Sequence, residues 1–236
     1  MKTIFHSASE RGVAEHGWLQ SRFSFSFADY YDAKKMGFGL LRVINDDIIE
    51  PAEGFGMHPH MNMEIVTIPL EGELEHKDNT GGGGVITPGE VQIMSAGTGI
   101  RHSEFNASAT TPVKLLQLWV FPLKEDITPR YDQKRFEPGK FHNTIGSVVA
   151  PDDASALWIN QNAWFSLSNL EENTNITYTT HNANSGVYCF LIEGEIFAAD
   201  IKLMKRDALG VCDTGSFEVK AVSAARVLFV EVPMEG

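Results

Sequence analysis

Apolar and polar side chains alternate at a two-residue period along much of this chain, which is the pattern of β-strands with one buried face. In residues 16–31, Phe23, Phe25 and Phe27 alternate with small or polar residues and predict a strand with an aromatic face. Residues 114–121 (KLLQLWVF) are almost continuously apolar, which is typical of a strand buried on both faces. The pattern therefore predicts an all-β fold.

Glycine-rich turns separate several of the expected strands. Residues 63–78 predict two strands joined at Glu71-Gly72, and residues 79–84 (NTGGGG) predict a flexible hairpin tip. Glycine suits such turns because it adopts backbone conformations that other residues avoid.

Two polar segments are expected to lie outside the strands. Residues 37–51 predict a strand followed by an acidic turn at Asn45, Asp46 and Asp47, which are turn-favouring residue types. Residues 126–136 (DITPRYDQKRF) are polar and rich in turn residues, so they predict a linker or a short helix.

The second half of the chain resembles the first. Residues 188–200 (YCFLIEGEIFAAD) resemble residues 64–76 (EIVTIPLEGELEH) around a shared Glu-Gly-Glu sequence, so Gly72 and Gly194 are expected to occupy equivalent turns. An internal duplication of short strands and glycine turns predicts two similar barrels or sandwiches in one chain.

Two short segments hold the residues best suited to bind a metal. His58 and His60 are separated by one residue, and so are His102 and Glu104. Because residues i and i+2 of a strand point to the same face, each segment would present two donors together. If the two strands face each other in a small barrel, three imidazoles and one carboxylate meet, a donor set that suits iron, nickel, copper, manganese or zinc.

The same alternation also allows a solvent-facing strand without a metal. Apolar residues, among them Met57, Pro59 and Met61, occupy the positions between the histidines. Ordinary amphipathic logic would bury these residues and leave the histidines in water. The recurrence of the same spacing in two pairs, each beside a glycine-rich turn, favours the metal site.

The ligand pairs have no counterpart in the second half of the sequence. We therefore expect a metal-binding barrel in residues 1–135 and a barrel without the metal ligands in residues 136–236.

Composition and charge exclude several classes of protein. The formal net charge of −12 excludes a nucleic-acid groove, which needs a basic face. The longest apolar runs have the length of strands and are too short to span a membrane, and the N-terminal residues lack the apolar region of a signal peptide. Cys189 and Cys212 lie in strand-like runs and do not form a disulfide framework, so a cytoplasmic location is expected.

Several motifs resemble the pirin family of bicupins. The resemblance is carried by residues 58–78 (HPHMNMEIVTIPLEGELEHKD) and 88–106 (PGEVQIMSAGTGIRHSEFN), and it extends to residues 16–32, 42–60 and 127–136. It covers essentially the whole chain. The resemblance implies an all-β bicupin, in which two antiparallel barrels of the jelly-roll type lie in one chain and the N-terminal barrel holds one metal ion.

The resemblance also implies a ligand set. Family members hold iron, or another divalent metal, on three histidines and one glutamate, which correspond here to His58, His60, His102 and Glu104. Fe(II) is the expected ion, and Ni, Cu, Mn or Zn are alternatives. Other cupins take their glutamate from the first motif, where Glu64 stands, and we expect Glu64 to share the inward face as a pocket-wall residue. The apolar residues between the histidines are then expected to pack outward against a second layer.

Some bacterial pirins resemble quercetin 2,3-dioxygenases, which implies a metal-dependent dioxygenase that opens a flavonol ring with O2. Glu104 or Glu64 would accept the proton of the 3-hydroxyl group as a general base. Five apolar residues are candidate pocket walls: Phe23, Phe25, Phe38, Met94 and Phe105.

An alternative function follows from other pirins, which act as regulators whose iron state tunes binding to a transcription factor or an enzyme. The expected partners are thus a flavonol-like aromatic substrate with O2, or a protein; direct contact with nucleic acid or membrane is not expected. Among the other histidines, His76 could border the pocket. Four are expected outside the site: His6, His16, His142 and His181.

Overall fold

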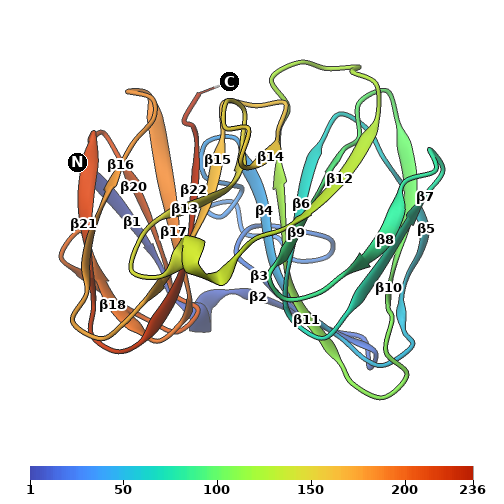
Figure 1. Cartoon of the computed structure of the whole chain (residues 1–236), viewed down its shortest axis with the longest axis horizontal. Coiled ribbons are helices and arrows are strands. Elements are labelled where there is room, and N and C mark those ends of the chain that lie inside the picture. Colours follow the sequence, from blue (N-terminus) through green and yellow to red (C-terminus); the bar gives the residue numbers. More distant parts are fainter. Residues whose placement is uncertain (236) are drawn as a thin grey trace.

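The computed structural model describes residues 1–235 as two β-barrels that lie side by side (Figure 1). Each barrel consists of a seven-stranded and a four-stranded sheet, and all strand pairs are antiparallel except β13 with β14. The prediction of an all-β fold with two antiparallel cupin barrels is confirmed.

The N-terminal barrel holds the expected metal-binding segments. Its seven-stranded sheet has the order β12-β9-β6-β11-β4-β3-β2, and its four-stranded sheet has the order β5-β10-β7-β8. The strands are β2 (Gly12–Glu15), β3 (Leu19–Phe23), β4 (Leu41–Ile49), β5 (Gly54–His60), β6 (Glu64–Glu71), β7 (Leu74–Asp78), β8 (Gly83–Ile86), β9 (Glu90–Ser95), β10 (Ile100–Asn106), β11 (Val113–Val120) and β12 (Arg130–Arg135).

The C-terminal barrel repeats this arrangement, with sheet orders β1-β20-β17-β22-β15-β13-β14 and β16-β21-β18-β19. Its strands are β1 (Lys2–His6), β13 (Gly146–Ala150), β14 (Leu157–Trp158), β15 (Trp164–Leu170), β16 (Asn175–Thr179), β17 (Ser185–Glu193), β18 (Glu195–Ala198), β19 (Ile201–Met204), β20 (Ala208–Cys212), β21 (Ser216–Ala221) and β22 (Ala225–Pro233). Two short 3-10 helices are η1 (Ala8–Glu10) and η2 (Pro138–Phe141).

The first strand crosses from one half of the chain to the other. β1 pairs with β20 along its whole length, so its residues complete the C-terminal seven-stranded sheet (Figure 1, blue strand at the left). β12 takes the equivalent edge position in the N-terminal sheet, beside β9. The limits 1–135 and 136–236 for the two domains stay predictions.

The seven-stranded sheets of the two barrels pack against each other, but the two barrel interiors contain different kinds of side chain. Residues of one face of β11, such as Leu116 and Leu118, pack with Phe190 and Leu228 of the C-terminal barrel in a core between the two large sheets. The interior of the C-terminal barrel is a second apolar core, with Phe229 among its residues. The interior of the N-terminal barrel also contains histidine, carboxyl and amide side chains, and these build the candidate site.

The expected acidic turn at residues 45–47 is wrong, because β4 runs through it. Asn45 and Asp47 alternate with Asp46, so the first two face the barrel interior and the third faces outward. There Asp46 accepts a hydrogen bond from Arg11 at 3.2 Å and forms an ion pair with Arg206 at 2.8 Å. Strand pairing and these two cations override the turn preference of the three residues.

The expected linker or short helix at residues 126–136 is also wrong in part. Residues Arg130–Arg135 form β12, which pairs with β9 in the sheet. β12 is the edge strand of its sheet. Edge strands carry charged side chains because one side of the strand is exposed to water, and this composition resembles that of a loop.

Two smaller findings concern the cysteines and the helices. Cys189 lies in β17 and Cys212 in β20, and both are free thiols in strands, as expected. Across residues 1–235, no helix has the length and apolar character that crossing a membrane requires.

Candidate metal centre

Three histidines meet between two adjacent strands. His58 of β5 and His102 of β10 are directly opposite each other in the strand register. Their ring centroids are 4.3 Å apart, and the His60 ring lies 4.9 Å from His58 and 4.8 Å from His102. One nitrogen of each ring lies within 4.8 Å of the others, which places three donors around one point.

Glu104 adjoins this group from the same face of β10. It forms a second cluster with His102 and His76, again with one donor atom of each within 4.8 Å of the others. Its Oε2 accepts a hydrogen bond of 2.8 Å from Gln117 Nε2, and Gln117 Oε1 in turn accepts from Trp119 Nε1 at 3.0 Å. Glu104 Oε1 is buried without a hydrogen-bond partner among the described residues.

An irregularity in β5 shapes the wall beside His58. His102 pairs with His58, but Glu104 pairs with Phe55, so β5 contains one more residue than β10 between these pairs. Such a bulge reverses the alternation and turns Phe55 to the same side as His58. The intervening apolar residues do not pack against a second layer as expected, because Met57 is 48% exposed and Met61 is 67% exposed.

Hydrogen bonds fix which nitrogen of His58 is free. Its Nδ1 lies 2.8 Å from the carbonyl oxygen of Gly56, and a carbonyl only accepts. Nδ1 therefore carries the proton, and Nε2 keeps its lone pair.

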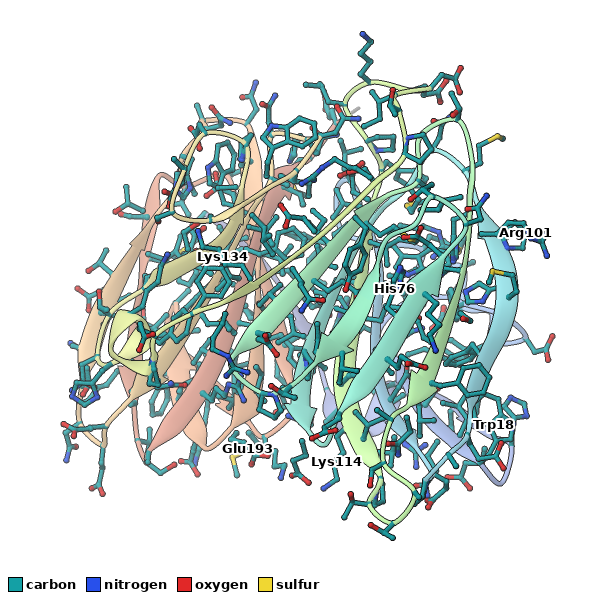
Figure 2. The ribbon with its side chains drawn as sticks, turned by 45° about the vertical axis from the view of Figure 1, so that its right-hand side comes forward. Trp18, His76, Arg101, Lys114, Lys134 and Glu193 are labelled. Carbon is teal, nitrogen blue, oxygen red and sulfur yellow. The ribbon has the colours of Figure 1, made fainter. Side chains whose placement is uncertain are left out.

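A chain of contacts fixes the protonated nitrogen of His102 in the same way. Asp78 Oδ2 lies 3.2 Å from His76 Nε2, and His76 Nδ1 lies 3.3 Å from His102 Nδ1. A carboxylate accepts from His76 Nε2–H, which leaves His76 Nδ1 as an acceptor for His102 Nδ1–H. His102 Nε2 then keeps its lone pair, and it is buried without a partner in the described structure. His76 is fully buried, whereas Arg101 is exposed at the edge of the barrel (Figure 2).

Asp78 is itself held firmly. Its Oδ1 accepts from the backbone N–H groups of Thr80 at 2.7 Å and Gly82 at 2.9 Å, and from the Thr80 hydroxyl at 2.7 Å. These bonds help to lower the pKa of Asp78, although its partial burial acts in the opposite direction. The NTGGGG turn between β7 and β8 thus orients the chain of side chains that ends at His102.

The electrostatics of the site favour neutral imidazoles. Burial lowers the pKa of His102 to about 2, assisted by the neighbouring histidines, and burial together with His58 lowers the pKa of His60 to about 4. Burial raises the pKa of Glu104 to about 7, against the opposing hydrogen bond from Gln117. Neutral imidazoles are the metal-binding form, and a cation at this point would favour the ionised carboxylate.

The donor set and the unpartnered atoms fit a divalent metal. His102 Nε2 and Glu104 Oε1 are buried polar atoms without hydrogen-bond partners within residues 1–235, and such atoms are rare in native proteins unless a water, an ion or a ligand pairs with them. Three nitrogens and one oxygen are suitable ligands for first-row divalent ions.

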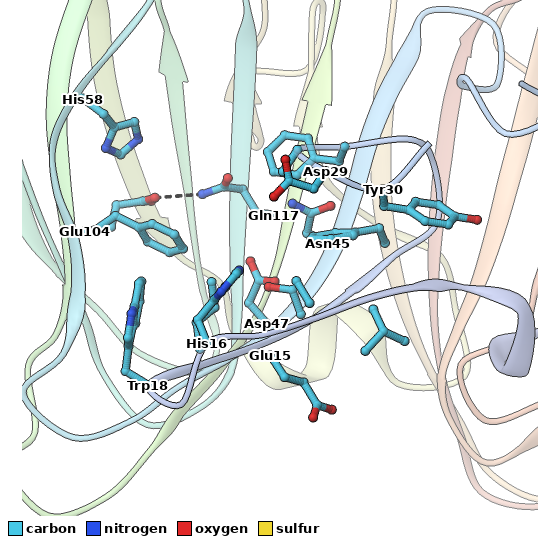
Figure 3. A pocket seen from close by; sticks show the side chains of 18 of the residues that line it. Glu15, His16, Trp18, Asp29, Tyr30, Asn45, Asp47, His58, Glu104 and Gln117 are labelled. Atoms are coloured by element: carbon cyan, nitrogen blue, oxygen red, sulfur yellow. Dashed lines mark hydrogen bonds between the residues drawn. The ribbon is translucent and has the colours of Figure 1, made fainter. Parts of the chain in front are cut away.

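A cavity of about 750 Å³ opens beside these residues, and His58, His60 and Glu104 line it. Its size is within the usual range of small-molecule sites, roughly 300–1,000 Å³. Figure 3 shows Glu104 and its hydrogen bond to Gln117 at one side of this space.

The pocket walls differ from those expected. Phe23 lines the cavity, but Phe25 and Phe38 pack in the core between the barrels. Met94 packs in a separate apolar cluster, and Phe105 is 36% exposed on the outer face of β10. The strand predicted for residues 16–31 ends at Phe23, so the three alternating phenylalanines do not share one face.

Several lining residues were not predicted. The unpredicted aromatic residues are Trp18, Tyr30, Phe55 and Trp119, and the unpredicted polar residues include Asn45, Asp47 and Gln117. Asn45, Asp47 and Gln117 share the alternation of their strands, which could have identified them once β4 was recognised as continuous.

Glu64 is not brought to this site. Its Oε2 accepts from Ser95 Oγ at 2.8 Å and from the backbone N–H of Asn160 at 3.2 Å, at the junction of the two barrels. The expectation that Glu64 shares the inward face with His58 is wrong, because a turn at Asn62, with φ of 48°, interrupts the alternation between β5 and β6. This placement gives no support to Glu64 as a general base.

The remaining histidines are dispersed. His76 contacts His102 but does not line the cavity, whereas exposed His16, expected outside the site, is part of the cavity wall. His6 bonds to the Tyr188 hydroxyl at 2.8 Å, and His181 bonds to buried Glu231 at 2.7 Å.

Comparison with known proteins identifies the family. Residues 5–120 match the family model described as Pirin, and residues 147–232 match the model described as Quercetinase C-terminal cupin domain. The chain is 42% identical over 230 residues to the quercetin 2,3-dioxygenase of Escherichia coli K12, covering 96% of each chain. It is 36% identical over 222 residues to a pirin-like protein of Caulobacter vibrioides, covering 93% of this chain and 95% of the relative.

Comparison with solved structures identifies the same family. The crystal structure of the bacterial pirin YhhW of Escherichia coli in complex with nickel(II) superposes with a TM-score of 0.93 at 40% identity, covering 98% of this chain and 99% of the other. The chain therefore belongs to the pirin family.

Proposed function

We propose that this protein is a metal-dependent dioxygenase of the quercetin 2,3-dioxygenase type, with His58, His60, His102 and Glu104 as the metal ligands. One observation carries the proposal: three neutral imidazoles and a carboxylate, with unpartnered donor atoms among them, adjoin an aromatic-lined cavity of about 750 Å³. Relatives named quercetin 2,3-dioxygenase support it.

The four side chains would hold one divalent ion, for which we propose Fe(II). Ni, Cu, Mn and Zn are alternatives that the same donor types accept. When bound, the ion supplies Lewis-acid and redox chemistry for the reaction of a flavonol with dioxygen.

The protein's own groups would orient the substrate and manage one proton. The rings of Trp18, Phe55 and Trp119 form apolar walls that hold a flat aromatic substrate and exclude water. Glu104 lies at the same wall, and its carboxylate would accept the proton of the flavonol 3-hydroxyl group. Gln117 donates to Oε2, so the carboxylate is oriented before substrate binds.

Dioxygen uptake after addition of quercetin tests the proposal, with the metal content of each sample quantified. We expect uptake by the metal-loaded protein, accompanied by release of carbon monoxide and ring opening. His102→Ala should abolish both metal retention and uptake. His142→Ala is the matched control, since the His142 side chain is 61% exposed in the C-terminal half of the chain.

The same experiment addresses the alternative function. A fully metallated protein that consumes no dioxygen with quercetin would contradict the proposal. It would leave a metal-responsive regulator that binds a protein partner as the remaining hypothesis.

A further inference from the structure

Two buried oxygen atoms in the cavity wall, Oδ1 of Asn45 and Oδ1 of Asp47, lack a hydrogen-bond donor in the described part of the chain. Asn45 and Asp47 lie two residues apart on β4, so both side chains face the barrel interior. They are 3% and 4% exposed, and the Oδ1 atom of each lacks a hydrogen-bond partner within residues 1–235. Native proteins leave few such atoms unpaired, so these two indicate a bound group that donates hydrogen bonds.

The strand register connects these acceptors to the metal centre. Asn45 lies opposite Gln117, the residue that donates to Glu104, and Asp47 lies one row further along β4, between Ser21 and Leu115. Two residues along a strand span about 7 Å. Both residues line the same cavity as the metal-binding side chains, and Figure 3 shows Asn45 and Asp47 around the space next to Gln117.

The surroundings of Asp47 do not supply a cation. No ion pair involving Asp47 occurs within the described part of the chain, and Arg11, whose charge reaches it weakly, pairs with Asp46 on the opposite face of β4. Burial raises the pKa of Asp47 to about 7, and the Ser21 hydroxyl opposes this shift. A neutral ligand hydroxyl, which donates a hydrogen bond, therefore suits the buried Asp47 carboxyl better than a negatively charged ligand group does.

The aromatic walls around the two acceptors favour a donor that is carried on a flat aromatic ring. Phe23 lies beside Asn45 in the strand register, and its ring is 5.5 Å from that of Phe27, which in turn contacts Trp119 at 5.2 Å. Flat rings bind well against such walls, and a hydroxyl on a ring edge can reach an acceptor at the back of the cavity. A phenolic hydroxyl combines both properties.

We propose that Asn45 and Asp47 accept hydrogen bonds from ring hydroxyl groups of the substrate that are remote from its metal-binding oxygens. They thereby select polyhydroxylated flavonols over flavonols that carry only the 3-hydroxyl group. This inference rests on the proposed function, and it names the substrate class that the same cavity takes.

Two flavonols separate the contribution of the 3-hydroxy-4-keto unit from that of the remote hydroxyl groups. Quercetin carries hydroxyl groups on both outer rings, whereas 3-hydroxyflavone keeps the 3-hydroxy-4-keto unit and lacks the others. The measurements are the Kd of each compound for the metal-loaded protein without dioxygen, and kcat/KM with dioxygen. We expect the wild-type protein to favour quercetin at least tenfold in both, because a polar site rejects ligands that leave its groups unpaired.

Asp47→Leu and Asn45→Leu remove the acceptors with a side chain of similar size. Each should reduce the preference for quercetin about tenfold, mainly through weaker quercetin binding, while the Kd of 3-hydroxyflavone stays the same or improves. Phe23→Leu is the matched control in the same wall. It should weaken both compounds by similar factors and keep the preference.

The outcomes are distinct. This inference is overturned if both leucine variants keep the wild-type preference for quercetin, or if the wild-type protein does not discriminate between quercetin and 3-hydroxyflavone. In either case the dioxygenase assignment stands. A metal-loaded protein that neither binds nor consumes either flavonol overturns both. If one leucine variant does not fold, as judged by its unfolding midpoint, the other decides the result.

Discussion

Asp47 is a carboxyl group whose burial costs stability. Its pKa is raised to about 7 in the folded chain, whereas its ordinary value is 3.8. Between these two pH values the folded protein holds a proton that the unfolded chain has released. Stability therefore falls as pH rises through this window and levels off above the folded pKa.

Asp47→Asn should remove this pH dependence. In metal-free protein, the free energy of unfolding of the variant relative to wild type should increase by about 2 kcal/mol from pH 5 to pH 8. Urea unfolding at several pH values measures this difference. Asp132→Asn, a change on the exposed edge strand, is the control and should show no comparable trend. A gap between Asp47→Asn and wild type that is independent of pH would show that the buried carboxyl ionises normally.

His76 is the second residue whose role emerges from its contacts. It links Asp78 to His102 and sets the protonated nitrogen of His102, so it should control metal affinity without binding the cavity ligand.

His76→Phe preserves the ring that stacks on Tyr131, 4.3 Å away, but removes both nitrogens. We expect metal affinity to fall about 10- to 100-fold, as measured by competition with a chelator, with little change in the folded state. His142→Ala should leave the affinity unchanged. Unaltered metal affinity in His76→Phe would mean that His102 does not need this orientation.

At the scale of elements, the duplication is confirmed at the two glycine turns. Gly72 follows β6 with φ of 77°, and Gly194 follows β17 with φ of 92°. A Cβ on either residue would collide with the backbone just before a neighbouring strand, at Pro112 before β11 and at Ala224 before β22. Both constraints, left-handed backbone and close approach, require glycine here.

Gly72→Ala and Gly194→Ala should each destabilise the protein by about 1–3 kcal/mol in chemical unfolding. Gly139→Ala should be nearly neutral, because that position has open space around it and an ordinary φ. Equal stability of all three variants would contradict the assigned role of the two turns.

Element boundaries also explain where residue patterns were insufficient. Strand alternation correctly pairs His58 with His60 and His102 with Glu104, because each pair lies within one strand. It misplaces Glu64, which lies beyond the turn at Asn62. Alternation predicts the face on which a side chain lies only as far as the strand is regular. Neither the turn at Asn62 nor the bulge in β5 has a distinctive sequence signature.

At the scale of the whole molecule, Glu64 joins the two barrels. It bonds to Ser95 within its own barrel and to the Asn160 backbone beyond it. A buried N–H left without an acceptor costs about 1–3 kcal/mol, so this carboxylate should contribute to stability rather than to chemistry.

Glu64→Leu should therefore destabilise the protein by about 1–3 kcal/mol while metal content remains unchanged. Glu64→Gln, which keeps an acceptor oxygen, should lose less. Thermal unfolding and metal quantification on the same samples provide the comparison. Loss of quercetin-dependent dioxygen uptake in Glu64→Gln, with stability and metal content intact, would restore Glu64 as a catalytic candidate.

The sequence by itself determined the all-β class, the duplication and the spacing of the two donor pairs. These depend on local periodicity and on glycine turns, which nearby residues specify. Only the tertiary structure decided which faces meet. The register between β5 and β10 brings His58 beside His102, and β7 places His76 behind them.

The tertiary structure also decided which polar side chains surround the candidate site inside the N-terminal barrel. Asn45, Asp47 and Gln117 come from strands far apart in sequence and become neighbours through the sheet order. Packing against the second barrel buries the opposite face of β4 and β11, so these polar side chains remain on the inner face. Such long-range pairing depends on the complete fold, and no local pattern encodes it.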